Sequence, residues 1–375
     1  MSKSKFEFTG DKQYNIFNIC EHRSSKIKQK EIKSLSGDYP IYGASGEIKK
    51  VDYFDVDKEY IAIVKDGAGA GRVMLLPKNS SVISTMMYII PNNDLIETKY
   101  LYYLLKSMNL ENLTTGATIP HLYFKNFKNK MVILPSLVVQ QNISLLFEKI
   151  EIIINSHINL LELYDKTIRG RFVELNKSII NKKYEKLKHN VEEMFIGPFG
   201  SSLKKDCFVD KKDAFCVVYE QKHAIQDSIN LGFRYVNKEK YEELKRFEVL
   251  GGDILVSCRG TVGKTTIIPQ NAPLGIMHPS IMKIRLKQEK YNKVYFQFLL
   301  NYYFHFVEQK LIGSGIKMGI KARDLGETDF LVPPIKIQNQ FADFVRQIDK
   351  SKVAVQASLD KTQMLFDSLM QEYFG

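Results

Sequence analysis

Two long segments of the chain repeat apolar residues at the spacing of a helical seam. In the first, mostly apolar side chains recur in steps of four and three from Ile143 to Ile179, with one step of seven residues. This heptad spacing is typical of a helix that buries one narrow stripe. With Ser136 as a suitable N-cap, the pattern predicts a helix that continues to about Lys182 and is roughly 70 Å long at about 1.5 Å per residue.

The C-terminal segment has the same periodicity from Phe341 to Tyr373, with polar Lys352 and Thr362 inside the stripe. A stripe this narrow buries little surface unless another helix covers it. We expect the two long helices to cover each other as an antiparallel two-stranded coiled coil. The alternative is a pair of separate helices that each dock on another protein.

The segments outside these helices have short apolar or β-branched runs that alternate with Gly, Pro and Asn. Such runs predict strands, and they lie at Ile61–Val64, Val73–Leu76, Met86–Ile90, Cys216–Tyr219, Asp253–Ser257, Thr265–Ile268 and Ile281–Leu286. Each half also contains one aromatic segment with helical character, Tyr100–Met108 or Tyr291–Val307. The pattern predicts an α+β fold.

Three passages of the first half return in the same order about half a chain later. The matched positions are Asn79 and Asn271 after a glycine-rich passage, Pro135 and Pro333 before a long helix, and Asp165 and Asp360 within it. We interpret this as a duplication. It predicts two similar globular domains, residues 1–135 and 190–333, separated by two long helical regions, residues 136–189 and 334–375.

The net charge of +12 favours a polyanionic partner. Nucleic acid is the preferred candidate for this partner, and an anionic membrane surface is the second candidate. The alternative is that the lysine-rich surface serves only solubility. The apolar runs are too short to span a bilayer, and the N-terminus lacks the apolar core of a secretory signal. Four scattered cysteines without metal-ligand spacing predict reduced thiols in a cytosolic protein and no metal site.

Two motifs suggest catalysis, and neither is complete. Gly260–Thr266 resembles a phosphate-binding loop, but Cys258 stands where the pattern needs its first glycine, and β-branched residues follow where it needs a helix. A tight turn between two strands with a basic residue at its tip explains this passage better. Glu47 and Lys49 with Asp38 are the nearest candidates for a nuclease centre, and a solvated strand edge is the preferred interpretation.

Glycine-rich polar loops with basic and aromatic residues are the most useful functional signal. Glycine permits close backbone approach, Lys and Arg neutralise phosphates, and Arg, Ser and Asn can read base edges. The candidate DNA-binding residues are Tyr42, Ser45, Lys65, Arg72, His121, Tyr123 and Lys125 in the first half, and Ser201, Ser202, Lys204, Arg259, Thr261, Lys264, His278, Lys317, Lys321 and Arg323 in the second.

Several of these passages resemble the specificity (S) subunits of bacterial type I restriction-modification systems. The resemblance covers nearly the whole chain and its order, and it rests on residues 39–46, 197–204, 252–256, 259–264 and the Pro-to-Gln runs that open each long helix. Each motif is weak alone, but the set together with the duplication is fairly specific. Recognition loops vary within the family, so the candidate residues above come from chemistry alone.

The resemblance implies two target-recognition domains that each read one half of a split double-stranded DNA site. It implies that the helices act as spacer and as docking surface for methyltransferase (M) subunits, with restriction (R) subunits in the same cytoplasmic complex. The chain would have no catalysis and no cofactor of its own. S-adenosylmethionine, ATP and Mg²⁺ would be bound by the partner subunits.

Other classes of function remain open from the sequence. Related S subunits serve fused type II enzymes of the IIB or IIG kind. A free-standing nuclease would act on DNA unaided, and loss of that activity on Lys264→Ala would favour it. A coiled-coil scaffold predicts no salt-dependent duplex binding, whereas phosphate neutralisation predicts an affinity that falls steeply with salt.

Overall fold

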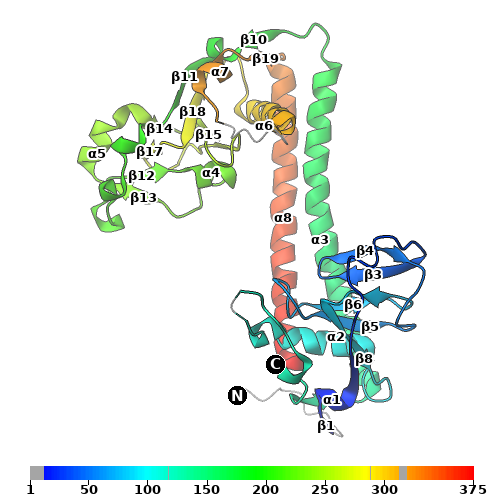
Figure 1. The fold of residues 1–375 in the computed structure, drawn as a ribbon. Coiled ribbons are helices and arrows are strands. Elements are labelled where there is room, and N and C mark those ends of the chain that lie inside the picture. The colour runs from blue at the N-terminus through cyan, green and yellow to red at the C-terminus, as the bar shows by residue number, and fades with distance from the viewer. Residues whose placement is uncertain (1–11, 117, 288, 312–318) are drawn as a thin grey trace. The chain divides into compact units, whose positions relative to one another are not determined.

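The structure is a computed structural model that describes residues 12–116, 118–287, 289–311 and 319–375. The chain divides into two compact units. Unit 1 holds residues up to 161 together with residues 354–375, and unit 2 holds residues 162–353. Each unit contains a globular lobe and a stretch of both long helices (Figure 1). We call residues 12–134 lobe 1 and residues 184–331 lobe 2.

Lobe 1 is built on an antiparallel four-stranded sheet. Its order is β2 (Cys20–Ser24), β8 (Met86–Pro91), β5 (Tyr60–Val64) and β6 (Val73–Leu76). A second sheet has the order β4 (Gly46–Val51), β3 (Tyr39–Gly43) and β7 (Ser81–Val82), in which β3 and β7 are parallel. β1 (Lys12–Asn15) pairs with β9 (Met131–Leu134), and the helices are α1 (Ile16–Ile19) and α2 (Thr98–Ser107).

Lobe 2 repeats this topology with one further strand, β14, in its second sheet. Its antiparallel sheet has the order β11 (Val191–Ile196), β18 (Ile281–Leu286), β15 (Ile254–Ser257) and β16 (Thr265–Ile267). The second sheet has the order β13 (Arg234–Val236), β12 (Cys216–Tyr219), β17 (Gly275–Met277) and β14 (Glu248–Val249), with β12 and β17 parallel. β10 (Tyr184–Lys186) pairs with β19 (Asp329–Leu331), and the helices are α4 (Gln221–Ile225), α5 (Lys238–Glu243), α6 (Lys293–Leu311) and α7 (Ala322–Gly326). The matching strand orders confirm the duplication.

The central strand of each main sheet is apolar on both faces because each face packs against a different core. Ile61 and Ile63 of β5 lie in the cluster that contains the buried residues of α2, whereas Ala62 and Val64 face a second cluster. A strand alternates its side chains between faces, so two cores require a continuous apolar run. β15 shows the same division, since Ile254 and Leu255 belong to different clusters.

The long helices are α3 (Leu137–Ser178) and α8 (Ile335–Phe374). Within each unit they lie side by side and run antiparallel (Figure 1). Phe147 of α3 meets Phe366 of α8 in unit 1 at 5.3 Å between ring centroids. In unit 2, Phe172 meets Phe341 at 5.4 Å. The predicted antiparallel pairing of the two helices is therefore confirmed.

The buried stripe of α3 differs from the predicted stripe, Ile143 to Ile179, in two places. Phe172 fills the seven-residue step of the predicted stripe and is buried against α6 and α8. Ile179, the last residue of the predicted stripe, lies beyond α3. The helix ends before Lys182 because the chain turns there towards β10, and Asn181 adopts a left-handed conformation with φ of 57°.

One buried glutamine fixes the start of each long helix to its lobe. Gln140 Nε2 donates to Leu95 O and Pro135 O, at 3.0 and 2.9 Å, while its Oε1 accepts from the Glu97 amide at 2.9 Å. The Gln140 side chain satisfies backbone groups at the N-terminus of α2 and at the entry to α3, which stabilises both.

Unit 2 uses the same arrangement. Gln338 Nε2 donates to Lys290 O and Pro333 O, at 3.0 and 2.8 Å, and Gln338 Oε1 accepts from the Asn292 amide at 2.9 Å. Both glutamines are fully buried. The Pro-to-Gln runs seen in the sequence are therefore the anchors of the two helices.

Among the residues that the structure describes, no helix has the length and apolar character needed to cross a bilayer. Cys20, Cys216 and Cys258 are buried free thiols, and burial raises the pKa of each, to about 12, 11 and 12 respectively. Glu47 and Lys49 lie on β4, an edge strand, as the preferred interpretation of that passage predicted.

Candidate nucleic-acid interface

The turn between β5 and β6 presents a cation at a sharp bend of lobe 1. Gly71 N donates to Val64 O at 2.8 Å, and Val64 N donates to Arg72 O at 3.0 Å. Gly71 has φ of +98°, a conformation that favours glycine, and a Cβ there would lie 2.3 Å from Glu111 N. Arg72 is exposed and directly follows this glycine.

Lobe 2 repeats this turn between β15 and β16. Gly263 N donates to Ser257 O at 2.8 Å, Ser257 N donates to Lys264 O at 2.8 Å, and Gly263 has φ of +79°. Exposed Lys264 follows this glycine as Arg72 follows its counterpart in lobe 1. An antiparallel strand follows the turn, whereas a phosphate-binding loop would lead into a helix. The predicted turn between two strands is confirmed, but it is a longer loop of residues 258–264, and Lys264 lies at its base opposite Ser257, where the prediction placed the basic residue at the tip.

Three loops of lobe 1 converge at its hairpin turn. Arg72 Nη1 donates to Ala44 O at 2.7 Å, which ties the turn to the β3–β4 hairpin, with Tyr42 on strand β3 and Ser45 in its loop. Leu122 N donates to Lys65 O at 2.8 Å, which ties the hairpin turn to the loop around residue 121. The structure therefore brings together the loops of all seven candidate residues of the first half.

Polar and aromatic contacts order the third of these loops. His121 Nδ1 lies 2.8 Å from Asp66 Oδ1, so the aspartate orients the imidazole ring. The ring of Tyr123 stacks beside His121 at 6.4 Å, and Lys125 Nζ lies 5.2 Å from the centre of the Tyr123 ring. Together these side chains form a partly exposed cationic and aromatic surface.

The structure adds His22 to this surface, which sequence reasoning missed. Its ring stacks on Phe124 at 4.5 Å with an angle of 4° between the planes. Burial and then the positive charge of Lys65 lower the pKa of His22. An isolated histidine on a strand gives no sequence signal for this contact, because Phe124 is far away in the chain.

In lobe 2, the hairpin turn meets the segment that carries His278. Cys258 N donates to Ser280 O at 2.9 Å, and Ser280 Oγ lies 2.8 Å from His278 Nδ1. Burial is the main reason that the pKa of His278 is lowered, and Arg234 contributes after it. Gly197 is pressed against this segment, since a Cβ there would lie 2.3 Å from His278 O. The loop with Ser201, Ser202 and Lys204 continues from Gly197.

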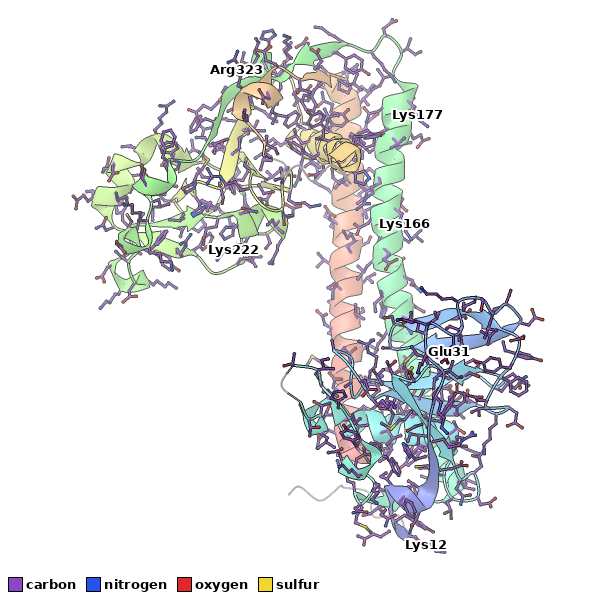
Figure 2. The ribbon with its side chains drawn as sticks, viewed as in Figure 1. Lys12, Glu31, Lys166, Lys177, Lys222 and Arg323 are labelled. Carbon is purple, nitrogen blue, oxygen red and sulfur yellow. The ribbon has the colours of Figure 1, made fainter. Side chains whose placement is uncertain are left out.

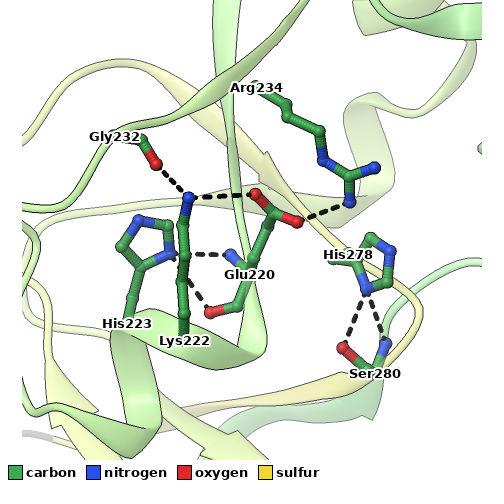
Figure 3. A network of polar contacts seen from close by, with 7 residues as sticks. All are labelled: Glu220, Lys222, His223, Gly232, Arg234, His278 and Ser280. Carbon is green, nitrogen blue, oxygen red and sulfur yellow. Dashed lines mark hydrogen bonds and ion pairs between the residues drawn. The ribbon is translucent and has the colours of Figure 1, made fainter. Parts of the chain in front are cut away.

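The N-terminal end of α4 completes the candidate surface of lobe 2 and was also missed. Gln221 Nε2 donates to Arg259 O and Thr261 O, which fixes the hairpin turn. Figure 3 shows the Glu220 carboxylate between the cations of Lys222 and Arg234. The polar run that follows β12 was the available sequence signal, but its partners come from separate loops.

The remaining candidates of the second half do not join this cluster. Lys321 and Arg323 belong to α7 and its N-cap, and α7 packs against β11. Figure 2 shows Arg323 and Lys222 in separate parts of unit 2. Lys317 lies outside the described residues.

Comparison with known proteins identifies the family of this chain. The model of the type I restriction modification DNA specificity domain matches it twice, at residues 11–163 and 189–361. A protein named as the N-terminus of a type I specificity subunit from Mycoplasma pneumoniae is 29% identical over 116 residues, which are 30% of this chain. The specificity subunit of the type I restriction enzyme MjaVIII from Methanocaldococcus jannaschii is 28% identical over 145 residues, or 38% of this chain. The chain spans 62% of the length of the first relative and 34% of the second.

Solved structures show the same fold. The S subunit of a type I restriction-modification system from M. genitalium has a TM-score of 0.64 at 15% identity, covering 100% of this chain and 99% of that one. A second chain, from work on complex assembly and conformational transition of the type I system, has a TM-score of 0.59 at 13% identity, covering 98% of each chain. With two matched domains that include both hairpin turns, this chain belongs to the type I restriction-modification DNA specificity family, as an S subunit.

Proposed function

We propose that each lobe reads one half of a two-part double-stranded DNA site through the surface around its hairpin turn. The observation that carries this proposal is the repeated turn, in which a glycine of positive φ is followed by an exposed cation, Arg72 in lobe 1 and Lys264 in lobe 2. Each copy of the family domain contains one such turn. Cations beside these turns can neutralise phosphates, and the polar side chains around them can reach base edges.

We also propose that the chain is not itself an enzyme and that it docks M and R subunits. Support comes from α3 and α8, which keep large apolar side chains exposed after pairing with each other, including Ile152, Leu163, Val353 and Met364. Exposed apolar surface of this kind is typical of a protein interface. On this proposal the partners bind S-adenosylmethionine, ATP and Mg²⁺, and the complex acts in the cytoplasm, where its DNA is.

Duplex binding as a function of salt tests the role of the two turns. Arg72→Ala and Lys264→Ala should each weaken duplex binding by the full chain, and each should reduce the slope of log K against log [salt] by about 1. The double variant should reduce this slope by about twice as much as either single variant does. Fluorescence anisotropy with a labelled duplex measures both quantities.

Lys166→Ala is the matched control because Lys166 is an exposed cation on α3, outside both lobes (Figure 2). It should leave the salt slope unchanged. If the control and the turn variants have the same slope as the unmodified chain, the hairpin turns do not contact DNA and the proposal fails.

A further inference from the structure

Arg234 in lobe 2 is held more firmly than an ordinary surface arginine. It lies on β13, an edge strand of the second sheet. Its guanidinium carbon lies 3.9 Å from the centre of the Phe208 ring, and its Nη2 forms an ion pair with Glu220 Oε1 (Figure 3). Stacking and a carboxylate together fix the plane of the guanidinium group.

The free donors of Arg234 lie at the end of its side chain. Nε is buried and has no hydrogen-bond partner among the described residues. Nη2 uses one of its two hydrogens for Glu220, which leaves the second hydrogen and the Nη1 group available. The side chain is 38% exposed, so Arg234 is accessible to a ligand. Two parallel donors in this geometry match the O6 and N7 acceptors of guanine.

The position of Arg234 joins it to the candidate surface of lobe 2. Val209 N donates to Tyr235 O at 3.0 Å, which ties β13 to the loop that begins with Ser201 and Lys204. Glu220 directly precedes Gln221, the residue that fixes the hairpin turn. Arg234 therefore lies between these two loops.

The charge balance around Arg234 suits a directional contact better than a phosphate contact. Glu220 also pairs with Lys222 at 3.5 Å, so one carboxylate offsets part of the charge of two cations. A phosphate contact needs charge and tolerates a mobile side chain, whereas base recognition needs a fixed pair of donors.

We propose that Arg234 is a specificity-determining residue that reads a guanine in the half-site of lobe 2, and that Glu220 and Phe208 are its positioning residues. This inference rests on the proposed DNA recognition and adds the base and the side chain that reads it.

Selection from a random duplex pool by the full chain, followed by sequencing of the bound fraction, tests the inference. The unmodified chain should enrich two half-site motifs. Arg234→Lys keeps the charge and removes the paired donors, so it should lower the preference for one guanine in one half-site by about tenfold. Glu220→Gln should weaken the same preference, and the other half-site should not change.

Arg246→Lys is the matched control. Arg246 also stacks on an aromatic ring, that of Phe195 at 5.6 Å, but it lies next to β14 at the opposite edge of the same sheet. It should leave both motifs unchanged. Uniformly weaker binding by Arg234→Lys, with both motifs retained, or no change at all, would overturn the role of Arg234 while leaving the proposed function intact. Absence of any two-part motif with the unmodified chain would overturn both.

Discussion

The buried imidazole of His223 makes the stability of lobe 2 depend on pH. Its ring is fully buried and stacks on Phe233 at 4.8 Å, and its Nδ1 accepts from the Glu220 amide at 2.9 Å. Burial lowers the pKa of His223 below its usual value. The unfolded chain therefore binds a proton more readily than the folded one, so the stability from neutral His223 is present above about pH 6.5 and is lost as the pH falls.

Thermal unfolding of the full chain should show this dependence. We expect the midpoint to fall between pH 7.5 and pH 5.5, and we expect His223→Gln to make the fall smaller, because glutamine does not titrate in this range. His189→Gln replaces an exposed imidazole and should leave the dependence unchanged. An equal fall for all three proteins would show that His223 does not contribute.

At the scale of the element, the start of each long helix depends on a single amide side chain. Gln338→Ala should destabilise unit 2 by about 2–3 kcal/mol, because it leaves two carbonyls and one amide, all at least partly buried, without their side-chain partner. Gln140→Ala should have a similar effect on unit 1. Urea denaturation measures both, and Gln340→Ala, at an exposed position of α8, is the control. A cost below about 0.5 kcal/mol would contradict the anchoring role.

The elements that could be predicted from the sequence are those set by local periodicity. Continuous apolar runs such as Ile61–Val64 predict buried strands, and the heptad pattern predicts α3 and α8. Phe172 fits the same spacing, four residues after Ile168, and the contact with α6 that also buries it could not be predicted from periodicity. A turn after β15 could be predicted because Gly260 and Gly263 closely follow a continuous apolar run, whereas the position of Lys264 at its base depends on the pairing with Ser257.

The contacts of the candidate site were less predictable because they join residues from separate loops. Lys65, Arg72 and His121 are predicted from chemistry alone, and the structure places their loops together. The sequence does not predict Arg234 and Glu220, since neither lies in a glycine-rich loop and their pairing depends on how β12 and β13 align. Composition cannot show which cation is held by a carboxylate and which is free.

At the scale of the whole molecule, α3 and α8 each begin in one unit and end in the other. On the proposed function, both helices set the length of the unread DNA between the half-sites. A heptad adds about 10 Å to a helix at about 1.5 Å per residue, which corresponds to roughly three base pairs at 3.4 Å each. A heptad in only one helix should instead misregister the seam between Phe147 and Phe366 or between Phe172 and Phe341 and damage assembly.

Methylation mapping by single-molecule sequencing, in a host that carries this chain with the M subunit that it is proposed to dock, tests the account most directly. The unmodified chain should give a two-part motif with a spacer of fixed length. With one heptad inserted in both helices, after Leu161 and after Val353, the two half-motifs should be unchanged and the spacer should be longer by about three base pairs. A single continuous motif, or an unchanged spacer in the lengthened chain, would contradict the account.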